Sequence, residues 1–446
     1  MWKRPLVKGT LILTLSGLFI RFLGLLNRAI LSRLIGAEGL GFFQIIIPVY
    51  TLLIVVAGAG LPGAITKMIA DRHSTGDVGT GVLIKNKAIK MVLASSVLIF
   101  LVYYPLLHLY VCHSNLDGRI VSALKIVAAG ILFASVSQIV RGFFQGSKMM
   151  TPTAVSQMGE QICRVGSGLA AAYVLMPFGL EYALCGITAG IVFGEIIGFI
   201  ILLLYRRFHL RKIEPCGSSF PVTLDRQLKK EMAVLSLPLL LLRVSGSVTH
   251  VFESLLIPAR LQKAGFNAAE SITLLGELAG MALPLLFLPT VFILPLNTVL
   301  VPYVAQAAVT KQKKTLNNIV RFSLWGTLGM GLSVSLVFRF FSPTLTSLFY
   351  GNSSAAPLVT MLALCAPLVY MQFTTASILH GLGHPGIAVF NDLAGTAVGL
   401  LLIYFLTALP SMGIYGAVWA YSASFALTSM LGCISSRFLV SGLIRR

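Results

Sequence analysis

Long apolar runs, separated by short polar segments, fill the chain from one end to the other. A helix needs about 20 mostly apolar residues to cross roughly 30 Å of hydrocarbon. Runs of about this length lie at residues 9–32, 40–70, 88–111, 120–143, 152–178, 182–205, 231–257, 278–307, 318–341, 355–382, 386–409 and 413–436. The pattern predicts an all-α polytopic membrane protein with about 12 transmembrane helices.

Two of these runs are long and contain residues that interrupt helices. The second run contains Gly58, Gly60, Pro62 and Gly63, and the eighth contains Pro284, Pro289, Pro295 and Pro302. Proline removes a backbone donor, and both residue types are common where helices kink. We expect both of these helices to bend, as pore-lining or rocking helices do.

A short polar pattern occurs twice inside the apolar runs. The pattern Arg21-x-x-Gly24-x-x-x-Arg28 in the first run is matched by Arg243-x-x-Gly246-x-x-x-His250 in the seventh. Six spans separate the two copies, so both have the same orientation in the membrane. The sequence therefore predicts a parallel internal repeat, related by an axis along the membrane normal.

The most polar stretch of the chain lies between the two copies of this pattern. It covers residues 208–229 and is predicted to be a cytoplasmic linker. It divides the chain into an N-terminal lobe, residues 1–207, and a C-terminal lobe, residues 230–446. Each lobe is predicted to contain six helices, and two such lobes suit transport by alternating access.

The charge balance fits a membrane protein and predicts its orientation. Hydrophobic residues make up 57% of the chain and charged residues 11%, which is not the balance of a soluble domain. Lysines and arginines gather in alternate connections, a bias that places both termini in the cytoplasm. This distribution also accounts for the net charge of +20. We therefore expect contact with anionic lipid and none with nucleic acid.

The sequence lacks the patterns of common catalytic and metal sites. Its six cysteines are scattered, without the close pairs that a zinc site or a disulfide framework uses. It contains no Walker-type phosphate loop and no His-Glu-x-x-His motif. We expect no metal, no cofactor and no enzymatic activity.

Cationic residues inside the predicted spans are candidates for a binding site. Arg21 lies about twelve residues into the first span, roughly 18 Å at 1.5 Å per residue and so near the bilayer midplane. Arg28 shares its helix face but lies near the outer edge, where it could also extend to the headgroups. In the second lobe, Arg243 lies at the same depth as Arg21. His250 lies about two turns further along the same helix face. Charges at membrane depth usually face a polar interior, so these four residues predict a cationic cavity.

Acidic residues inside the spans have two interpretations. Glu160 and Arg164 are spaced i, i+4 in the fifth span and could neutralise one another. Glu195, Glu253 and Asp392 lie in other spans. Each could be an ion- or proton-coupling site, or a charge partner for the arginines.

Several motifs resemble one known family. They are Lys8-Gly-x-x-x-Leu, Arg21-x-x-Gly24, Ile35-Gly-Ala-Glu-Gly-x-Gly41, Gly60-Leu-Pro-Gly-Ala-Ile-Thr-Lys-Met-Ile-Ala70, Arg141-Gly-Phe-Phe-Gln-Gly146, Met150-x-Pro152 and Ser156-Gln-x-x-Glu160-Gln-x-x-Arg164-Val165. Together they resemble the polysaccharide-exporter branch of the multidrug/oligosaccharidyl-lipid/polysaccharide (MOP) flippase superfamily, and within it the stage V sporulation protein B group. The resemblance covers essentially the whole chain, and residues 141–165 are its most specific part.

The resemblance implies a MATE-like transporter fold in the bacterial cytoplasmic membrane. It implies a flippase that moves a lipid-linked glycan, an undecaprenyl-pyrophosphate oligosaccharide or peptidoglycan precursor, from the inner to the outer leaflet. It also implies partners among cell-wall or spore-envelope synthesis proteins. The similar lipid II flippases use arginines of the first span in a cationic cavity, which corresponds here to Arg21 and Arg28.

Three other functions stay open. A cation-coupled multidrug exporter of the same superfamily would need an acidic, aromatic cavity, for which Glu160, Glu195 and Asp392 are candidates. A membrane glycosyltransferase would normally need large outer loops, and the loops here are short. A non-transporting scaffold of the sporulation membrane would keep the fold without the flux.

Overall fold

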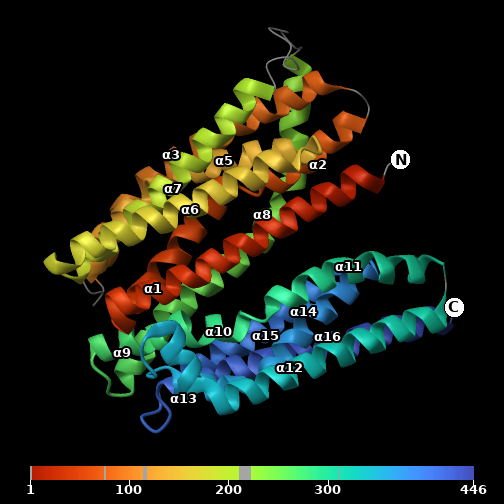
Figure 1. Cartoon of the computed structure of the whole chain (residues 1–446). Coiled ribbons are helices and arrows are strands. Elements are labelled where there is room, and N and C mark those ends of the chain that lie inside the picture. The colour runs from red at the N-terminus through yellow and green to blue at the C-terminus, as the bar shows by residue number, and fades with distance from the viewer. Residues whose placement is uncertain (1–2, 75–76, 114–117, 210–221, 311, 446) are drawn as a thin grey trace. The chain divides into compact units, whose positions relative to one another are not determined.

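The computed structural model describes all residues except 1–2, 75–76, 114–117, 210–221, 311 and 446, and the described part is helical, without β-strands (Figure 1). Its first helices are α1 (Lys3–Gly58), α2 (Leu61–Ser74), α3 (Val78–His113), α4 (Val121–Ala128), α5 (Gly130–Gly146), α6 (Met150–Leu175), α7 (Leu180–His209) and α8 (Val222–Lys263). The later ones are α9 (Ala268–Leu275), α10 (Leu283–Phe287), α11 (Thr290–Val309), α12 (Lys313–Tyr350), α13 (Ala356–Ala363), α14 (Ala366–Gly381), α15 (Pro385–Leu406) and α16 (Ile414–Arg445). The predicted all-α class is confirmed.

The helices are long and apolar enough for a multi-pass membrane protein. Among the described residues, 9 helices meet the length and hydropathy of a membrane span, or up to 11 spans if each of two bent pairs counts as one. The first covers Leu11–Gly58, whose 48 residues are about twice what one crossing needs. The fifth predicted run corresponds to α6, which is not among these spans and carries Glu160 and Arg164 in its middle.

The first predicted span and most of the second lie in one helix, α1, which has a break inside it. α1 is interrupted at Gly36, where φ is 69° and ψ is −174°. A second break follows at Ala59 and Gly60, with φ of 48° and 69°, and there α1 gives way to α2. A Cβ at Gly60 would lie 2.2 Å from the carbonyl oxygen of Ser236 on α8, so this position needs glycine for space as well as for its backbone angle. The predicted bend of the second run is confirmed.

The eighth predicted run is also broken, as its prolines predict. A π-helix at Gly276–Ala282 leads into α10, and Pro289 precedes the first residue of α11. Pro295 and Pro302 remain inside α11. Proline inside a helix removes a backbone hydrogen bond, and the interruption at Leu288 and Pro289 divides this run between the spans Ala268–Phe287 and Thr290–Val309.

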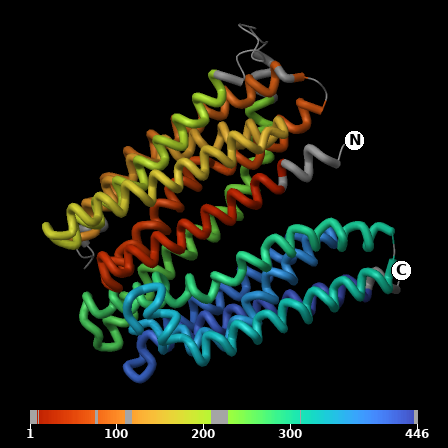
Figure 2. The backbone as a smooth tube through the Cα atoms, in the orientation of Figure 1, coloured from red at the N-terminus to blue at the C-terminus, as the bar shows by residue number. Residues whose placement is uncertain are grey.

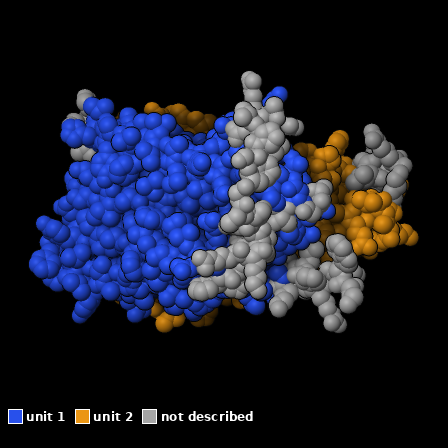
Figure 3. Space-filling model, turned by 90° about the horizontal axis from the view of Figure 1, so that it is seen from above, with its two compact units in different colours: residues 1–35, 45–252 blue, residues 36–44, 253–446 orange. Residues whose placement is uncertain are grey.

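The chain packs as two compact units (Figures 2 and 3). Unit 1 contains residues 1–35 and 45–252, and unit 2 contains residues 36–44 and 253–446. Most of the predicted linker, residues 208–229, lies outside the described residues. The division into two six-helix lobes about that linker stays a prediction.

Unit 1 contains a hydrophobic core and one especially close helix pair. The core joins α2, α3, α5, α7 and α8 through residues such as Ile65, Phe144 and Met232. α6 and α7 lie side by side along most of their length (Figure 1). A Cβ at Gly190 of α7 would lie 2.4 Å from the Cα of Gly168, and one at Gly194 would lie 2.8 Å from the carbonyl oxygen of Glu160. Glycine therefore permits the backbones of α6 and α7 to approach closely, as small residues do between membrane helices.

Replacing Gly190 with alanine is expected to destabilise unit 1, because the added methyl group must push α6 away from α7. Overpacking of this kind typically costs about 1–3 kcal/mol. The matched control is Gly166→Ala on α6, since a Cβ at Gly166 would meet no atom within 4 Å. Thermal unfolding in detergent should give a lower midpoint for Gly190→Ala and an unchanged or slightly raised one for Gly166→Ala. Equal midpoints would contradict the proposed role of close packing.

Candidate functional site

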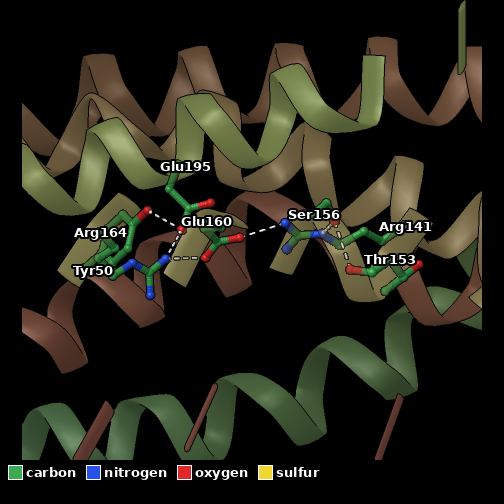
Figure 4. A network of polar contacts seen from close by, with 7 residues as sticks. All are labelled: Tyr50, Arg141, Thr153, Ser156, Glu160, Arg164 and Glu195. Carbon is green, nitrogen blue, oxygen red and sulfur yellow. Dashed lines mark hydrogen bonds and ion pairs between the residues drawn. The ribbon is translucent and has the colours of Figure 1, made fainter. Parts of the chain in front are cut away.

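Charged side chains form a connected group inside unit 1, where α5, α6 and α7 meet α1 (Figure 4). Nη2 of Arg141 donates to Oε2 of Glu160 at 2.7 Å. Nη2 of Arg164 contacts Oε1 of Glu160 and donates to Oε1 of Glu195 at 2.7 Å. The hydroxyl of Tyr50 donates to the same oxygen of Glu195 at 3.2 Å. We call these five residues the charge network.

The hydroxyl of Ser156 on α6 holds one end of the charge network in place. Nε of Arg141 donates to Oγ of Ser156 at 3.0 Å. The same Ser156 hydroxyl donates to the carbonyl oxygen of Thr153, one turn earlier, at 2.9 Å (Figure 4). Arg141 thus binds two residues of α6, and its guanidinium has a defined orientation toward Glu160.

The members of the charge network are largely buried. The side chains of Arg141, Glu160 and Glu195 are 11%, 12% and 7% exposed, and that of Arg164 is 28% exposed. Taking one charge out of water costs several kcal/mol unless it is paired. Two arginines and two glutamates sum to zero charge, and charge-assisted hydrogen bonds connect all four. This pairing offsets part of the cost of burying the four side chains.

The network links four helices. Glu160 and Arg164 come from α6, Arg141 from α5, Glu195 from α7 and Tyr50 from α1. The close approach of α6 and α7 allows Glu195 to reach Arg164, because glycine lies at their contact. At Gly198, one turn after Glu195, a Cβ would be only 3.1 Å from Nη2 of Arg141. The network therefore acts chemically as a neutral polar cross-link.

The charge network joins residues that their spacing in the sequence does not bring together. The i, i+4 pair of Glu160 and Arg164 is in contact. Glu195, which lies 31 residues beyond Arg164, joins the pair. Arg141 is a partner that sequence reasoning missed as a site residue, since it lies 19 residues before Glu160 on another helix. Its only sequence signal was its place in the motif Arg141-Gly-Phe-Phe-Gln-Gly146.

The four predicted cationic residues lie in unit 1 on α1 and α8. Arg21, Arg243 and His250 are exposed, and Arg28 is half-buried. A Cβ at Gly24, between the two arginines of α1, would lie 3.9 Å from Nε2 of Gln161 on α6. α1 thus passes beside α6 next to the charge network.

The two remaining acidic candidates lie in unit 2. Glu253 of α8 has a side-chain hydrogen bond with Tyr421 of α16. Asp392 of α15 accepts a hydrogen bond from Nε2 of Gln372 at 3.1 Å. Each therefore has a neutral hydrogen-bonding partner within its own unit. In the part of the chain that the structure describes, no three His, Cys, Asp or Glu side chains gather as a metal site would require.

Comparison with protein families gives a match over most of the chain. A family model described as polysaccharide biosynthesis protein matches residues 6–308. Stage V sporulation protein B of Bacillus subtilis (strain 168) is 31% identical over an alignment of 443 residues, which covers 97% of this chain and 83% of that protein. Lipid II flippase MurJ of the same organism is 24% identical, over 96% of this chain and 82% of that protein.

Comparison with solved structures concerns the fold. An inward-facing multidrug resistance MATE family transporter of the MOP superfamily is similar with a TM-score of 0.77. The match covers 95% of this chain and 96% of the other, at 16% sequence identity. The fold is that of a MOP transporter, as the resemblance of the sequence motifs implies.

Breaking the charge network should destabilise the protein strongly. In Glu160→Gln, Arg141 and Arg164 lose the carboxylate they share, and leaving buried charges without their partner typically costs about 3–5 kcal/mol. The matched control is Glu231→Gln, because the Arg72–Glu231 pair has side chains 37% and 40% exposed. Exposed pairs contribute about 0–1 kcal/mol. Thermal unfolding in detergent should separate the two variants clearly, and equal stability would contradict the account of the buried pairs.

Proposed function

We propose that this chain, which belongs to the polysaccharide biosynthesis protein family, is a flippase for a lipid-linked glycan. The substrate class is an undecaprenyl-pyrophosphate oligosaccharide or peptidoglycan precursor. Transport runs from the inner to the outer leaflet of the bacterial cytoplasmic membrane, and both termini lie in the cytoplasm. The observation that carries the proposal is the likeness, over nearly the whole chain, to a sporulation protein and to a lipid II flippase.

The cationic residues of unit 1 give this proposal a physical basis. Arg21 and Arg28 lie on one face of α1, and Arg21 is exposed. A pyrophosphate needs compensation for its charge as it passes the hydrocarbon layer. Arginine supplies a permanent charge and bidentate hydrogen bonds suited to phosphate oxygens. Arg243 and His250 are proposed to contribute in the same way from α8.

Two of the three acidic residues that a cation exporter could use are paired with arginines, which favours a glycolipid over an organic cation as substrate. A cation exporter would use carboxylates that are available in its cavity. Glu160 and Glu195 are instead bound to arginines inside unit 1. Their proposed role is to hold α5, α6 and α7 together beside α1. The helices next to the arginines of α1 then keep fixed positions.

Two compact units with broken helices suit transport by alternating access. Energy would come from an ion gradient, the membrane potential or consumption of the product on the far side. Enzymes of cell-wall or spore-envelope synthesis, which consume such glycans, are the proposed partners.

Leaflet inversion of a fluorescent undecaprenyl-pyrophosphate glycan in proteoliposomes tests the proposal. The wild type should transport it, and Arg21→Gln should lower the initial rate about tenfold or more at matched insertion, because a charged hydrogen bond contributes about 1.5–3 kcal/mol. The matched control is Arg33→Gln, since Arg33 is exposed on the same helix but lies off the Arg21–Arg28 face. Its rate should stay close to that of the wild type.

Two results would contradict the proposal. Ethidium transport by the wild type without glycolipid transport would identify a drug exporter. Transport of neither substrate by well-folded protein would favour a scaffold of the membrane. A rate for Arg21→Gln equal to that of Arg33→Gln would leave the flippase but reject the cationic site.

A further inference from the structure

A cavity lies within unit 2, apart from every residue assigned above. It has a volume of about 430 Å³, which is in the range of small-molecule sites. α12, α14 and α16 supply its walls, and its lining includes Asn317, Arg321, Trp325, Leu328, Met371 and Arg437. Figure 1 shows that the beginning of α12 and the C-terminal end of the chain lie at the same end of unit 2.

Two arginines from different helices meet at this cavity. Arg321 comes from α12 and Arg437 from α16, and both line it. Both are exposed, and among the described residues neither has an acidic partner. Two guanidinium groups at one cavity repel each other unless an anion lies between them. Asn317, one turn before Arg321, adds an amide that can donate a hydrogen bond.

The charged and amide side chains of the cavity lie near the ends of their helices, and apolar side chains continue beyond them along α12. Asn317 and Arg321 lie near the beginning of α12, and Arg321 is only about 12 Å from its start at 1.5 Å per residue. Arg437 lies at a similar distance from the end of α16. Trp325 and Leu328 follow on the same side of α12, one and two turns further into the helix. A ligand that fits this order has an anionic head and an apolar tail.

We propose that this cavity binds the phosphate group of a membrane amphiphile. The phosphate oxygens accept hydrogen bonds from Arg321 and Arg437, and arginine is well suited to bidentate contact with phosphate. The apolar chain extends past Trp325 toward Leu328 and Met371. An anionic phospholipid and a prenyl pyrophosphate carrier share this chemistry. Binding at this cavity requires no transport by the protein.

Tryptophan fluorescence tests the site directly, because Trp325 lines it. The sequence has 3 tryptophans, so Trp2→Phe and Trp419→Phe leave Trp325 as the only one. This parent protein is reconstituted in phosphatidylcholine, and brominated phosphatidylglycerol or brominated phosphatidylcholine is added at equal mole fractions. Bromine quenches tryptophan on contact. We expect phosphatidylglycerol to bind about tenfold more strongly, from the strength of a charge-assisted hydrogen bond.

The arginines are tested in the same background. Arg321→Gln with Arg437→Gln should remove the preference for phosphatidylglycerol. The matched control is Arg339→Gln, since Arg339 is also an exposed arginine of α12 but is absent from the cavity lining. It should keep the full preference. An unchanged emission maximum of Trp325 shows that the variants are folded. No preference in the parent, or the same preference in the double variant, would overturn the proposal.

Competition distinguishes the sources of the phosphate. Farnesyl pyrophosphate that displaces brominated phosphatidylglycerol at a much smaller mole fraction would identify a prenyl carrier as the ligand. Displacement only in proportion to its share of the lipid would identify bulk anionic phospholipid. Either result supports a phosphate-bearing amphiphile. Displacement by inorganic pyrophosphate as effectively as by farnesyl pyrophosphate would overturn the role of the apolar chain.

Discussion

Pairing of buried charges between α5, α6 and α7 is the constraint on which unit 1 depends. Glu160 binds both Arg141 and Arg164, and Arg164 also binds Glu195. In a low-dielectric interior an unpaired member would be very costly, whereas the complete set is neutral. The three helices must therefore stay in the relative positions that keep every pair formed.

Backbone packing and this charge network support each other. Gly190 and Gly194 permit α7 to approach α6, and the approach brings Glu195 to Arg164. Tyr50 extends the network to α1, and Gly24 places an earlier part of α1 beside Gln161. α1, which carries these arginines, thus lies beside helices whose buried charges sum to zero. In the proposed flippase the arginines of α1 contact the anionic substrate, while the glutamates of the charge network hold the helices.

Local features of the fold could be predicted from sequence, and long-range ones could not. The breaks at Gly60 and before Thr290 follow from glycine and proline, which change the backbone wherever they occur. The Glu160–Arg164 contact follows from spacing on a single helix. The partners Arg141 and Glu195 depend on how α5 and α7 pack on α6, which no periodicity reveals. The cavity at Arg321 and Arg437 likewise joins residues far apart in the chain.

Replacing one ion pair of the network with apolar residues tests the central claim most directly. Arg164→Met with Glu195→Leu removes one charge of each sign and leaves Arg141 and Glu160 paired. Such replacements are often neutral for stability. If the network is structural, this double variant should flip a fluorescent undecaprenyl-pyrophosphate glycan within about twofold of the wild-type rate at matched insertion. A folded, inserted double variant that no longer transports would contradict the account, because these charges would then belong to the transport step itself.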